Sequence, residues 1–317
     1  MPQPILLAFG VSARMRGRFE ALYEVHGPVG GVRPETVPPK ARHARALITI
    51  GGHRTDAALM DALPDLGLIA CYGTGYEGVD LAAAKARGIQ VTHAKDANAT
   101  SVAEFAMGLV IAASRDMTKG ERMLRAGEWP NRKAERMPLV PGLAGQRMGI
   151  YGLGAIGMRV ATRAAAFEME VGYHGRSPRE GIAYGYHPTL RGLAEWCDVL
   201  VVAVRATAAN RHAVDREVLA ALGKHGVLVN VARGLVVDEA ALTEALEQGV
   251  IAAAGLDVFE HEPHVPERLR ALPNAVLTPH MAAFTLSAQR AQAQVMLDAL
   301  EDFFAGRAPA NLVAEMA

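Results

Sequence analysis

A glycine-rich turn between a strand pattern and a helix pattern constrains the fold of this chain more than any other feature. Residues 147–167, RMGIYGLGAIGMRVATRAAAF, place Gly152, Gly154 and Gly157 in the spacing GxGxxG, directly after a short apolar run. In such a strand–turn–helix unit the three glycines permit a tight turn, close approach to a pyrophosphate, and close packing of helix on strand. Free N–H groups at the positive end of the helix then bind phosphate. The stretch therefore predicts a Rossmann-type nucleotide site at Gly152, Leu153, Gly154, Ala155, Ile156 and Gly157.

Short apolar runs alternate with helical patterns along the rest of the chain. Because these runs are continuously apolar, they suit strands covered on both faces, as in parallel sheets with crossover helices. A length of 317 residues favours two domains. The predicted fold class is therefore α/β, with two doubly wound parallel-sheet domains. The apolar runs span residues 4–9, 46–50, 66–72, 147–152, 169–174, 198–204, 226–232, 251–259 and 274–279.

Two long helical patterns suggest how the domains connect. Residues 100–129 predict one long hinge helix, capped by Thr100 or Ser101 with Glu104 completing a capping box. Near the C-terminus, Met296, Leu300, Phe303 and Phe304 recur at helical spacing. We expect that helix to pack back on the first domain. The expected boundaries are a discontinuous, flavodoxin-like domain of residues 1–98 and 286–317 and an inserted Rossmann domain of residues 99–285.

The composition argues against several classes of partner. The formal net charge is zero, which gives no electrostatic grip on nucleic acid or an anionic membrane. The apolar run around residues 105–113 is too short to span a bilayer, and the first twenty residues lack the pattern of a signal peptide. Two cysteines make neither a disulfide framework nor a zinc site. We expect a cytoplasmic protein without a metal, nucleic-acid or membrane partner.

The segment after the second strand of the Rossmann unit bears on the choice of cofactor. A carboxylate at the end of this strand would accept hydrogen bonds from the adenosine ribose and favour NAD. In VGYHGRSPRE, residues 171–180, that strand end lacks one, and Arg176, Ser177 and Arg179 follow instead. These side chains could contact a 2′-phosphate, which predicts NADP(H), with NAD possible. The alternative is that both arginines are solvated loop residues.

Three polar side chains stand just past predicted strands further along the chain. Arg233 follows residues 226–232, Glu262 follows residues 251–259, and His280 follows residues 274–279. Ligands of parallel α/β sheets bind beyond the carboxyl ends of strands, so these three can converge on one cleft. A metal site in GLDVFEHEPHVPE, residues 255–267, is disfavoured because the spacing matches no common zinc pattern. In this stretch Glu262 is the acid expected to matter, while Glu260 and His261 are expected to face solvent.

Several ordered motifs together resemble the D-isomer-specific 2-hydroxyacid dehydrogenase family, in particular its glyoxylate/hydroxypyruvate reductase branch. The resemblance covers essentially the whole chain. The matching segments are GTGYEGVDLAAAKARGIQVTHAKDANATSVAEFAMGL, GLGAIG, VNVARGLVVDEAAL, GLDVFEHEP and TPHMA.

The resemblance implies a role for individual residues. Arg233 matches an arginine that holds the substrate carboxylate and the neighbouring oxygen. His280 matches the acid–base histidine, and Glu262 its carboxylate partner. Backbone amides of Thr74 and Gly75 would bind the substrate carboxylate.

The resemblance also implies contacts with the cofactor and the pocket. Thr100 lies where the family touches the cofactor. Asp257 is either a neighbour of the nicotinamide carboxamide or a structural residue. Trp129 and Met137 lie where this branch often lines its substrate pocket.

The family pattern implies an NADP(H)-dependent reductase of small 2-oxo acids such as glyoxylate or hydroxypyruvate, acting as a homodimer. Two departures are Arg205, where the family usually has proline, and Ala282 followed by Phe284, where a glycine is common. Other specificities, such as 2-ketogluconate or phenylpyruvate, stay open. So does an NAD(H)-sensing corepressor that dimerises. A formate dehydrogenase is disfavoured, because that family pairs its histidine with glutamine and this chain has Glu262.

Overall fold

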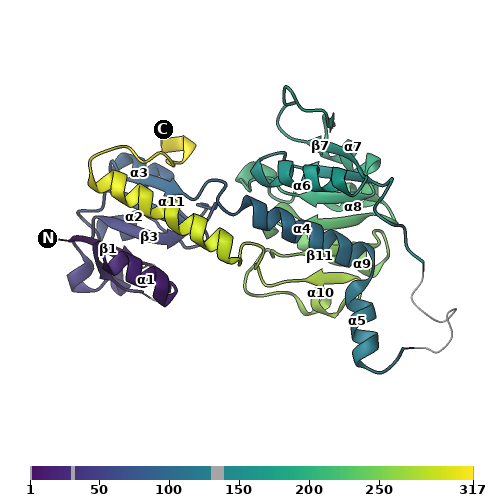
Figure 1. Cartoon of the computed structure of the whole chain (residues 1–317), viewed down its shortest axis with the longest axis horizontal. Helices are drawn as coiled ribbons and strands as arrows, with labels where there is room; N and C mark the ends of the chain where they lie inside the picture. The colour runs from purple at the N-terminus through teal and green to yellow at the C-terminus, as the bar shows by residue number, and fades with distance from the viewer. Residues whose placement is uncertain (1, 30–32, 130–138, 317) are drawn as a thin grey trace. The chain divides into compact units, whose positions relative to one another are not determined.

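The computed structural model describes residues 2–29, 33–129 and 139–316. The chain divides into two compact units, one of Met1–Asn98 with Thr285–Ala317 and one of Ala99–Phe284. Each unit has one sheet whose named strands all pair in parallel, with helices packed on both faces (Figure 1). Two doubly wound α/β sheets are what the continuous apolar runs predict, and the fold class is confirmed.

The first unit has a five-stranded sheet in the order β2-β1-β3-β4-β5, the flavodoxin-like order. Residues of β1, β3 and β4 alternate between two buried clusters, one shared with α1 and α11 and the other with α2 and α3. The elements are β1 (Gln3–Leu7), α1 (Ala13–Glu20), β2 (Tyr23–His26), β3 (Ala46–Ile50), α2 (Ala57–Asp61), β4 (Leu68–Tyr72), α3 (Leu81–Ala86), β5 (Gln90–His93) and α11 (Leu286–Phe304), with 3₁₀ turns at Pro34–Thr36, Pro39–Ala41 and Ala314–Met316.

The second unit has a seven-stranded sheet in the order β12-β11-β10-β9-β6-β7-β8. If β6 is counted as strand 1 and the sheet is read from β8, the order is 3-2-1-4-5-6-7. This is the doubly wound order 3-2-1-4-5-6 with one further strand, and the direction of winding reverses between β6 and β9. Helices α4 and α6 share one buried cluster, and α7, α8 and α9 share the other. The strands are β6 (Arg147–Tyr151), β7 (Glu170–His174), β8 (Gly185–Tyr186), β9 (Val199–Val202), β10 (Val227–Asn230), β11 (Ala253–Leu256) and β12 (Ala275–Leu277). The helices are α4 (Ala99–Ser114), α5 (Met117–Arg125), α6 (Ala155–Ala166), α7 (Leu190–Trp196), α8 (Arg216–Leu222), α9 (Glu239–Glu247) and α10 (Glu267–Ala271), with 3₁₀ turns at Ala208–Asn210 and Gly234–Val236.

The predicted single helix over residues 100–129 is wrong. It is two helices, α4 and α5, which meet at Asp116 with φ +50°. The apolar pattern of α4 ends at Ser114 and is followed by charged residues, and Asp tolerates the left-handed region better than most residues. The expected cap is also misplaced, because α4 begins at Ala99 and Thr100 lies inside its first turn.

Three short strands were absent from the sequence prediction: β2, β5 and β8. Their sequences are YEVH, QVTH and GY, so none contains an apolar run long enough to be recognised. Each lies at or beside a sheet edge, where partial exposure tolerates polar side chains.

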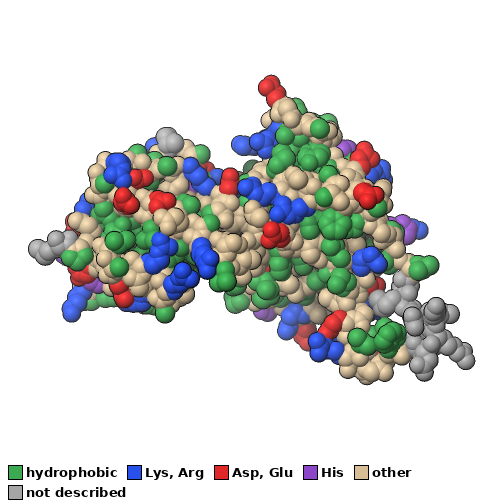
Figure 2. Space-filling model, viewed as in Figure 1, with side chains coloured by type: hydrophobic (Ala, Val, Ile, Leu, Met, Phe, Trp, Pro, Cys, Tyr) green, Lys and Arg blue, Asp and Glu red, His purple; other side chains and the backbone are tan. Residues whose placement is uncertain are grey.

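The distribution of charged side chains and the polarity of the helices agree with the zero net charge and the short apolar runs of the sequence. On the face drawn in Figure 2, acidic and basic side chains are interspersed over both units. Among the described residues, the helices are all too short or too polar to cross a bilayer.

Candidate active site

The glycine turn lies between β6 and α6, where the winding of the seven-stranded sheet reverses. Gly152 has φ +97°, and a Cβ there would lie 2.5 Å from the Cα of Val204 on the neighbouring strand end. A Cβ on Gly157 would lie 2.1 Å from the carbonyl oxygen of Gly152. Gly154, by contrast, is exposed, and a Cβ there would meet nothing within 4 Å. Two glycines are thus required by the protein's own packing, and the middle one borders open space.

This arrangement fits a dinucleotide. Gly154 is the N-cap of α6, so unpaired N–H groups at the helix start face the open side of the turn. Leu153 is buried, while Ala155 and Ile156 form the first residues of α6. An anion at this end of the helix meets a positive dipole and little steric resistance.

The three residues predicted to read a 2′-phosphate follow β7 and have different environments. Arg176 and Ser177 are exposed. Arg179 donates from its guanidinium to the carbonyl oxygen of Leu153, and its backbone N–H donates to the Tyr173 hydroxyl at 2.8 Å. Arg179 therefore ties the loop after β7 to the glycine turn, which places this loop beside the end of β6.

Thr100 is tied to the same helix. Its hydroxyl accepts a hydrogen bond from Nε of Arg159 on α6 at 3.2 Å, and the Thr100 side chain is exposed near the start of α4. Helices α4 and α6 share a buried cluster, so Thr100 stands on the glycine-turn side of the sheet.

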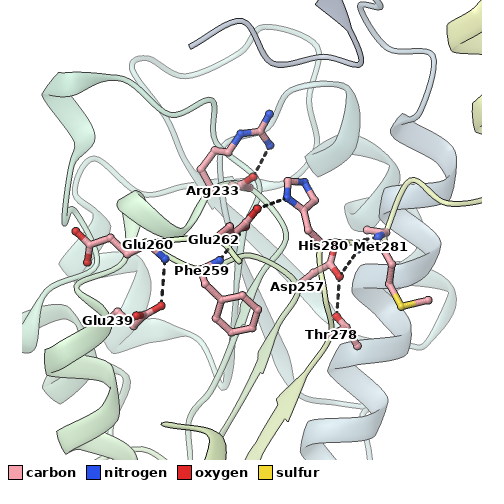
Figure 3. Close-up of polar contacts among 11 residues, drawn as sticks. Arg233, Glu239, Asp257, Phe259, Glu260, Glu262, Thr278, His280 and Met281 are labelled. Carbon is pink, nitrogen blue, oxygen red and sulfur yellow. Dashed lines mark hydrogen bonds and ion pairs between the residues drawn. The ribbon is translucent and has the colours of Figure 1, made fainter. Parts of the chain in front are cut away.

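The arginine, glutamate and histidine predicted to converge follow three neighbouring strands. Arg233 follows β10, Glu262 follows β11 and His280 follows β12, and these strands are adjacent and parallel. Figure 3 shows their side chains gathered at the strand ends. Parallel strands present their carboxyl ends at one sheet edge, so residues far apart in the chain meet there.

His280 and Glu262 form the central pair. Nδ1 of His280 lies 2.7 Å from Oε2 of Glu262, and Oε1 of Glu262 accepts the backbone N–H of Phe259 at 3.0 Å. His280 has φ +50°, an uncommon conformation for a residue with a side chain. The pair is partly open, with the His280 side chain 46% and the Glu262 side chain 35% exposed. The carboxylate thus fixes one ring nitrogen and leaves Nε2 for another partner.

The electrostatics keep Glu262 ionised. Partial burial is the largest single influence and raises the pKa of Glu262, but the hydrogen bonds from His280 and Phe259 and the charges of His280 and Arg233 outweigh it. The pKa of Glu262 is therefore lower than that of an ordinary glutamate. A carboxylate that stays charged at neutral pH stabilises a protonated imidazole beside it.

Arg233 is held close to this pair. It is half-buried, and its Nη1 donates to the carbonyl oxygen of Ala232 at 2.8 Å. Asn230 Nδ2 donates to the Arg233 carbonyl oxygen at 3.1 Å and fixes the backbone there. Gly234 permits this approach, because a Cβ at that position would fall 1.9 Å from the carbonyl carbon of Phe259.

Asp257 anchors the turn that carries His280. The side chain is 1% exposed. Oδ1 accepts hydrogen bonds from the Thr278 hydroxyl at 2.7 Å and the Met281 N–H at 2.9 Å, and Oδ2 accepts the Ala282 N–H at 2.9 Å (Figure 3). These three bonds reach residues on both sides of His280. Asp257 was expected to be either a neighbour of the nicotinamide or a structural residue, and its contacts support the structural role.

The expectation that Glu260 faces solvent is wrong. Its side chain is only 11% exposed, and Oε1 contacts both Arg211 and, at 2.8 Å, Nε2 of His212. Its N–H donates to Oε2 of Glu239 at 3.1 Å, which gives Glu239 a structural role (Figure 3). Arg211, His212 and Glu239 lie 49, 48 and 21 residues away in the chain, so no local pattern pointed to them. His261 is exposed, as predicted.

Thr74 and Gly75 lie in the first unit, in the loop after β4. The Thr74 carbonyl oxygen is 3.1 Å from Nδ1 of His93. Gly75 is packed against Gly51. A Cβ on Gly51 would fall 2.3 Å from the carbonyl atoms of Gly75. The loop is therefore fixed by Gly51, just after β3, and by His93, the last residue of β5.

Other candidates are less informative. Trp129 is 58% exposed, and Met137 lies outside the described residues. Within the described part of the chain no cluster of three or more histidine, cysteine, aspartate or glutamate side chains could hold a metal ion.

Comparison with known proteins gives a consistent result. Residues 107–282 match the model of the D-isomer specific 2-hydroxyacid dehydrogenase NAD-binding domain. A glyoxylate/hydroxypyruvate reductase A of Arabidopsis thaliana is 40% identical over 263 residues, 83% of each chain. A 2-ketogluconate reductase of Gluconobacter oxydans is 38% identical over 290 residues, 92% of each chain.

A solved structure is also similar along its whole length. It is the NADPH-dependent glyoxylate/hydroxypyruvate reductase of Sinorhizobium meliloti in complex with NADP and malonate. The TM-score is 0.92 at 40% identity, covering 100% of this chain and 98% of that one. The chain described here belongs to the D-isomer specific 2-hydroxyacid dehydrogenase family.

Proposed function

We propose that this chain is an NADP(H)-dependent reductase that converts small 2-oxo acids, such as glyoxylate or hydroxypyruvate, into D-2-hydroxy acids. The observation that carries the proposal is the Glu262–His280 pair, 2.7 Å apart, with Arg233 beside it at the ends of three adjacent strands. A cation for a carboxylate and a proton donor next to it are the groups that carbonyl reduction of a 2-oxo acid needs. The names of the similar reductases support the same reaction.

Each of the three residues has a distinct part. Arg233 would bind the substrate carboxylate and the adjacent carbonyl oxygen with its planar guanidinium, which orients the carbonyl carbon. His280 would donate a proton to the carbonyl oxygen, and in the reverse direction accept it from the hydroxyl. Glu262 would hold the ring so that the other nitrogen faces the substrate. Backbone N–H groups of Thr74 and Gly75 would hold the substrate carboxylate.

The cofactor would be held by the turn of Gly152, Leu153, Gly154, Ala155, Ile156 and Gly157, with Thr100 and Asp257 as further neighbours. When bound, its nicotinamide supplies the hydride. Arg176, Ser177 and Arg179 would favour the 2′-phosphate of NADP(H), because no carboxylate ends β7 to receive a ribose hydroxyl. The NADP complex of the Sinorhizobium meliloti reductase supports this preference.

We also propose a homodimer. Helix α5 exposes Met117 and Leu124 by 55% and 57%, and an apolar face of this kind favours a protein partner. Light scattering after gel filtration tests this: a mass of twice 33.7 kDa is expected, and a monomer would contradict it.

The experiment for the activity is a set of initial rates. NADPH and NADH are each offered with glyoxylate, hydroxypyruvate, 2-ketogluconate and phenylpyruvate, and absorbance of the reduced cofactor is followed. Consumption of NADPH with at least one acid, at a higher kcat/KM than with NADH, is expected. Tight cofactor binding without turnover would instead favour a regulatory binding protein.

A further inference from the structure

Two acidic residues of the second unit are buried. Among the residues that the structure describes, Asp257 and Glu239 are the acidic residues with the least exposure, 1% and 9%. A carboxylate is costly to bury unless hydrogen bonds replace those it made with water. Asp257 holds the turn that carries His280. Glu239 takes no part in the chemistry proposed above, so its burial needs a separate reason.

Glu239 lies at the start of α9, but another residue caps this helix. Oδ1 of Asp238 accepts the N–H of Ala241 at 2.9 Å, which is the usual bond of an N-cap side chain. The carboxylate of Glu239, in the first turn, is favoured by the positive end of the helix dipole. The helix therefore helps to keep a charge at position 239, while the Glu239 side chain is directed to a neighbouring segment.

That segment is the turn that carries Glu262. Oε2 of Glu239 accepts the N–H of Glu260 at 3.1 Å, and Oε1 of Glu262 accepts the N–H of Phe259 at 3.0 Å (Figure 3). Two consecutive backbone N–H groups are thus received by two carboxylates. The second oxygen of Glu262 lies 2.7 Å from Nδ1 of His280. The Phe259 N–H therefore sets how the Glu262 carboxylate faces the imidazole, and Glu239 holds the residue next to it.

Tight packing joins the same two segments. A Cβ on Gly234 would fall 1.9 Å from the carbonyl carbon of Phe259 and 2.3 Å from the backbone nitrogen of Glu260. Gly234 follows Arg233 directly and is five residues before Glu239 in the chain. Close packing at a glycine prevents the segments from approaching further, whereas the hydrogen bond to Glu239 prevents them from separating. Both contacts come from the short stretch that also carries the proposed substrate-binding arginine.

The side chain of Glu260 is a separate attachment. It points away from Glu262 in Figure 3 and pairs with Arg211 and His212, which follow β9. This pair holds the side chain of residue 260. The bond to Glu239 instead fixes the backbone of residue 260, beside the N–H group on which the Glu262 carboxylate rests.

Resting on the proposed function, we propose that Glu239 is a positioning residue for proton transfer, which holds the N–H of Glu260 and thereby keeps the Glu262 carboxylate on His280. This role depends on the reach of an oxygen acceptor and not on its charge. Aspartate at position 239 keeps the charge but is one methylene shorter, so it no longer reaches the Glu260 N–H. Glutamine keeps the reach and the acceptor oxygen but loses the charge.

The test compares Glu239→Asp with Glu239→Gln, using NADPH and hydroxypyruvate. In Glu239→Asp, kcat should fall about tenfold or more while both KM values stay within about threefold, because a misplaced acid–base group slows the reaction without weakening substrate binding. In Glu239→Gln, kcat and KM should stay within about threefold of wild type. A loss of equal size in the two variants, or full activity in Glu239→Asp, would overturn the positioning role.

The matched control makes the same change at the other end of α9. Glu247→Asp shortens an acidic side chain that pairs with Arg268 at 2.6 Å, and it should leave kcat and both KM values unchanged. Melting temperatures of all variants show that they are folded at the temperature of the assay.

A second background separates positioning from a general loosening of the fold. In Glu262→Ala no carboxylate is left to be held, so adding Glu239→Asp should lower kcat by less than about twofold further. A further loss as large as the one that Glu239→Asp causes in wild type would show that Glu239 does not act through Glu262, and would overturn the proposal.

Failure of the proposed function gives a different result. In that case wild type oxidises NADPH with none of the 2-oxo acids offered. Crystal structures of the two variants then decide the positioning role alone. A His280–Glu262 hydrogen bond that is lost in Glu239→Asp and kept in Glu239→Gln supports the role, and a bond kept in both or lost in both overturns it.

Discussion

Replacing Glu262 by glutamine isolates the electrostatic part of its proposed role. The amide keeps the size and hydrogen-bonding capacity of the side chain but removes the charge 2.7 Å from the imidazole of His280. At that separation, Coulomb's law with the dielectric constant of water gives about 1.5 kcal/mol. Both side chains are more than a third exposed, so dissolved salt screens the pair further and reduces this to about 1 kcal/mol.

That energy converts into a shift of the pH profile. One pH unit corresponds to about 1.36 kcal/mol, so the high-pH limb of kcat/KM for reduction should move to lower pH by roughly 0.7 unit. The direction follows because reduction needs the protonated ring, and the amide no longer stabilises its positive charge. The carboxylate of wild type does not itself titrate in this range: its pKa is lowered, so its contribution is lost only as the pH falls through that lowered pKa.

The assay is kcat/KM with NADPH and hydroxypyruvate from pH 5 to 9, for wild type and Glu262→Gln. Glu260→Gln is the matched control, since it makes the same change two residues away in a side chain that pairs with Arg211 and His212 rather than His280. The high-pH limb of the Glu260→Gln profile should not move. A Glu262→Gln profile lowered at every pH with an unchanged limb would refute the electrostatic role and leave Glu262 only as a structural support.

The remaining predictions concern the histidine, the glycine turn and the cofactor. His280→Ala should lower kcat by about 10²- to 10⁴-fold with NADPH affinity retained, and unchanged turnover in stopped-flow assays would remove its acid–base role. Gly157→Ala should lower the melting temperature, because its Cβ would fall 2.1 Å from the Gly152 carbonyl oxygen. Gly154→Ala, where a Cβ meets nothing within 4 Å, should keep that temperature and weaken NADPH binding in fluorescence titration; the opposite ranking would contradict the roles assigned to the two glycines. Arg176→Ala should raise KM for NADPH roughly 10- to 100-fold and leave KM for NADH within twofold, whereas equal changes would count against 2′-phosphate recognition.

The fold class and the convergence of Arg233, Glu262 and His280 could be predicted from the sequence. Both depend only on local patterns and on one rule of sheet topology. Continuous apolar runs predict parallel strands, and side chains just beyond such strands meet at one edge whatever their separation in the chain. That rule sufficed to bring Glu262 and His280 together without any contact being known.

What the sequence did not reveal depends on contacts between distant segments. Glu260 looks like a solvated acid in a charged loop, and only the folded chain brings Arg211 and His212 to it. The three bonds from Asp257 to the turn of His280 cross 21 to 25 residues. The break at Asp116 depends on a single left-handed residue, which a helical periodicity over 30 positions does not exclude.

Isotope transfer tests the central claim most directly. The protein is incubated with hydroxypyruvate and NADPH that carries deuterium at both C4 positions, and glycerate is recovered for mass spectrometry and chiral chromatography. The account predicts D-glycerate with one deuterium at C2. Formation of L-glycerate or of unlabelled glycerate would contradict it. So would the absence of any hydroxy acid product from hydroxypyruvate and from every other 2-oxo acid tested.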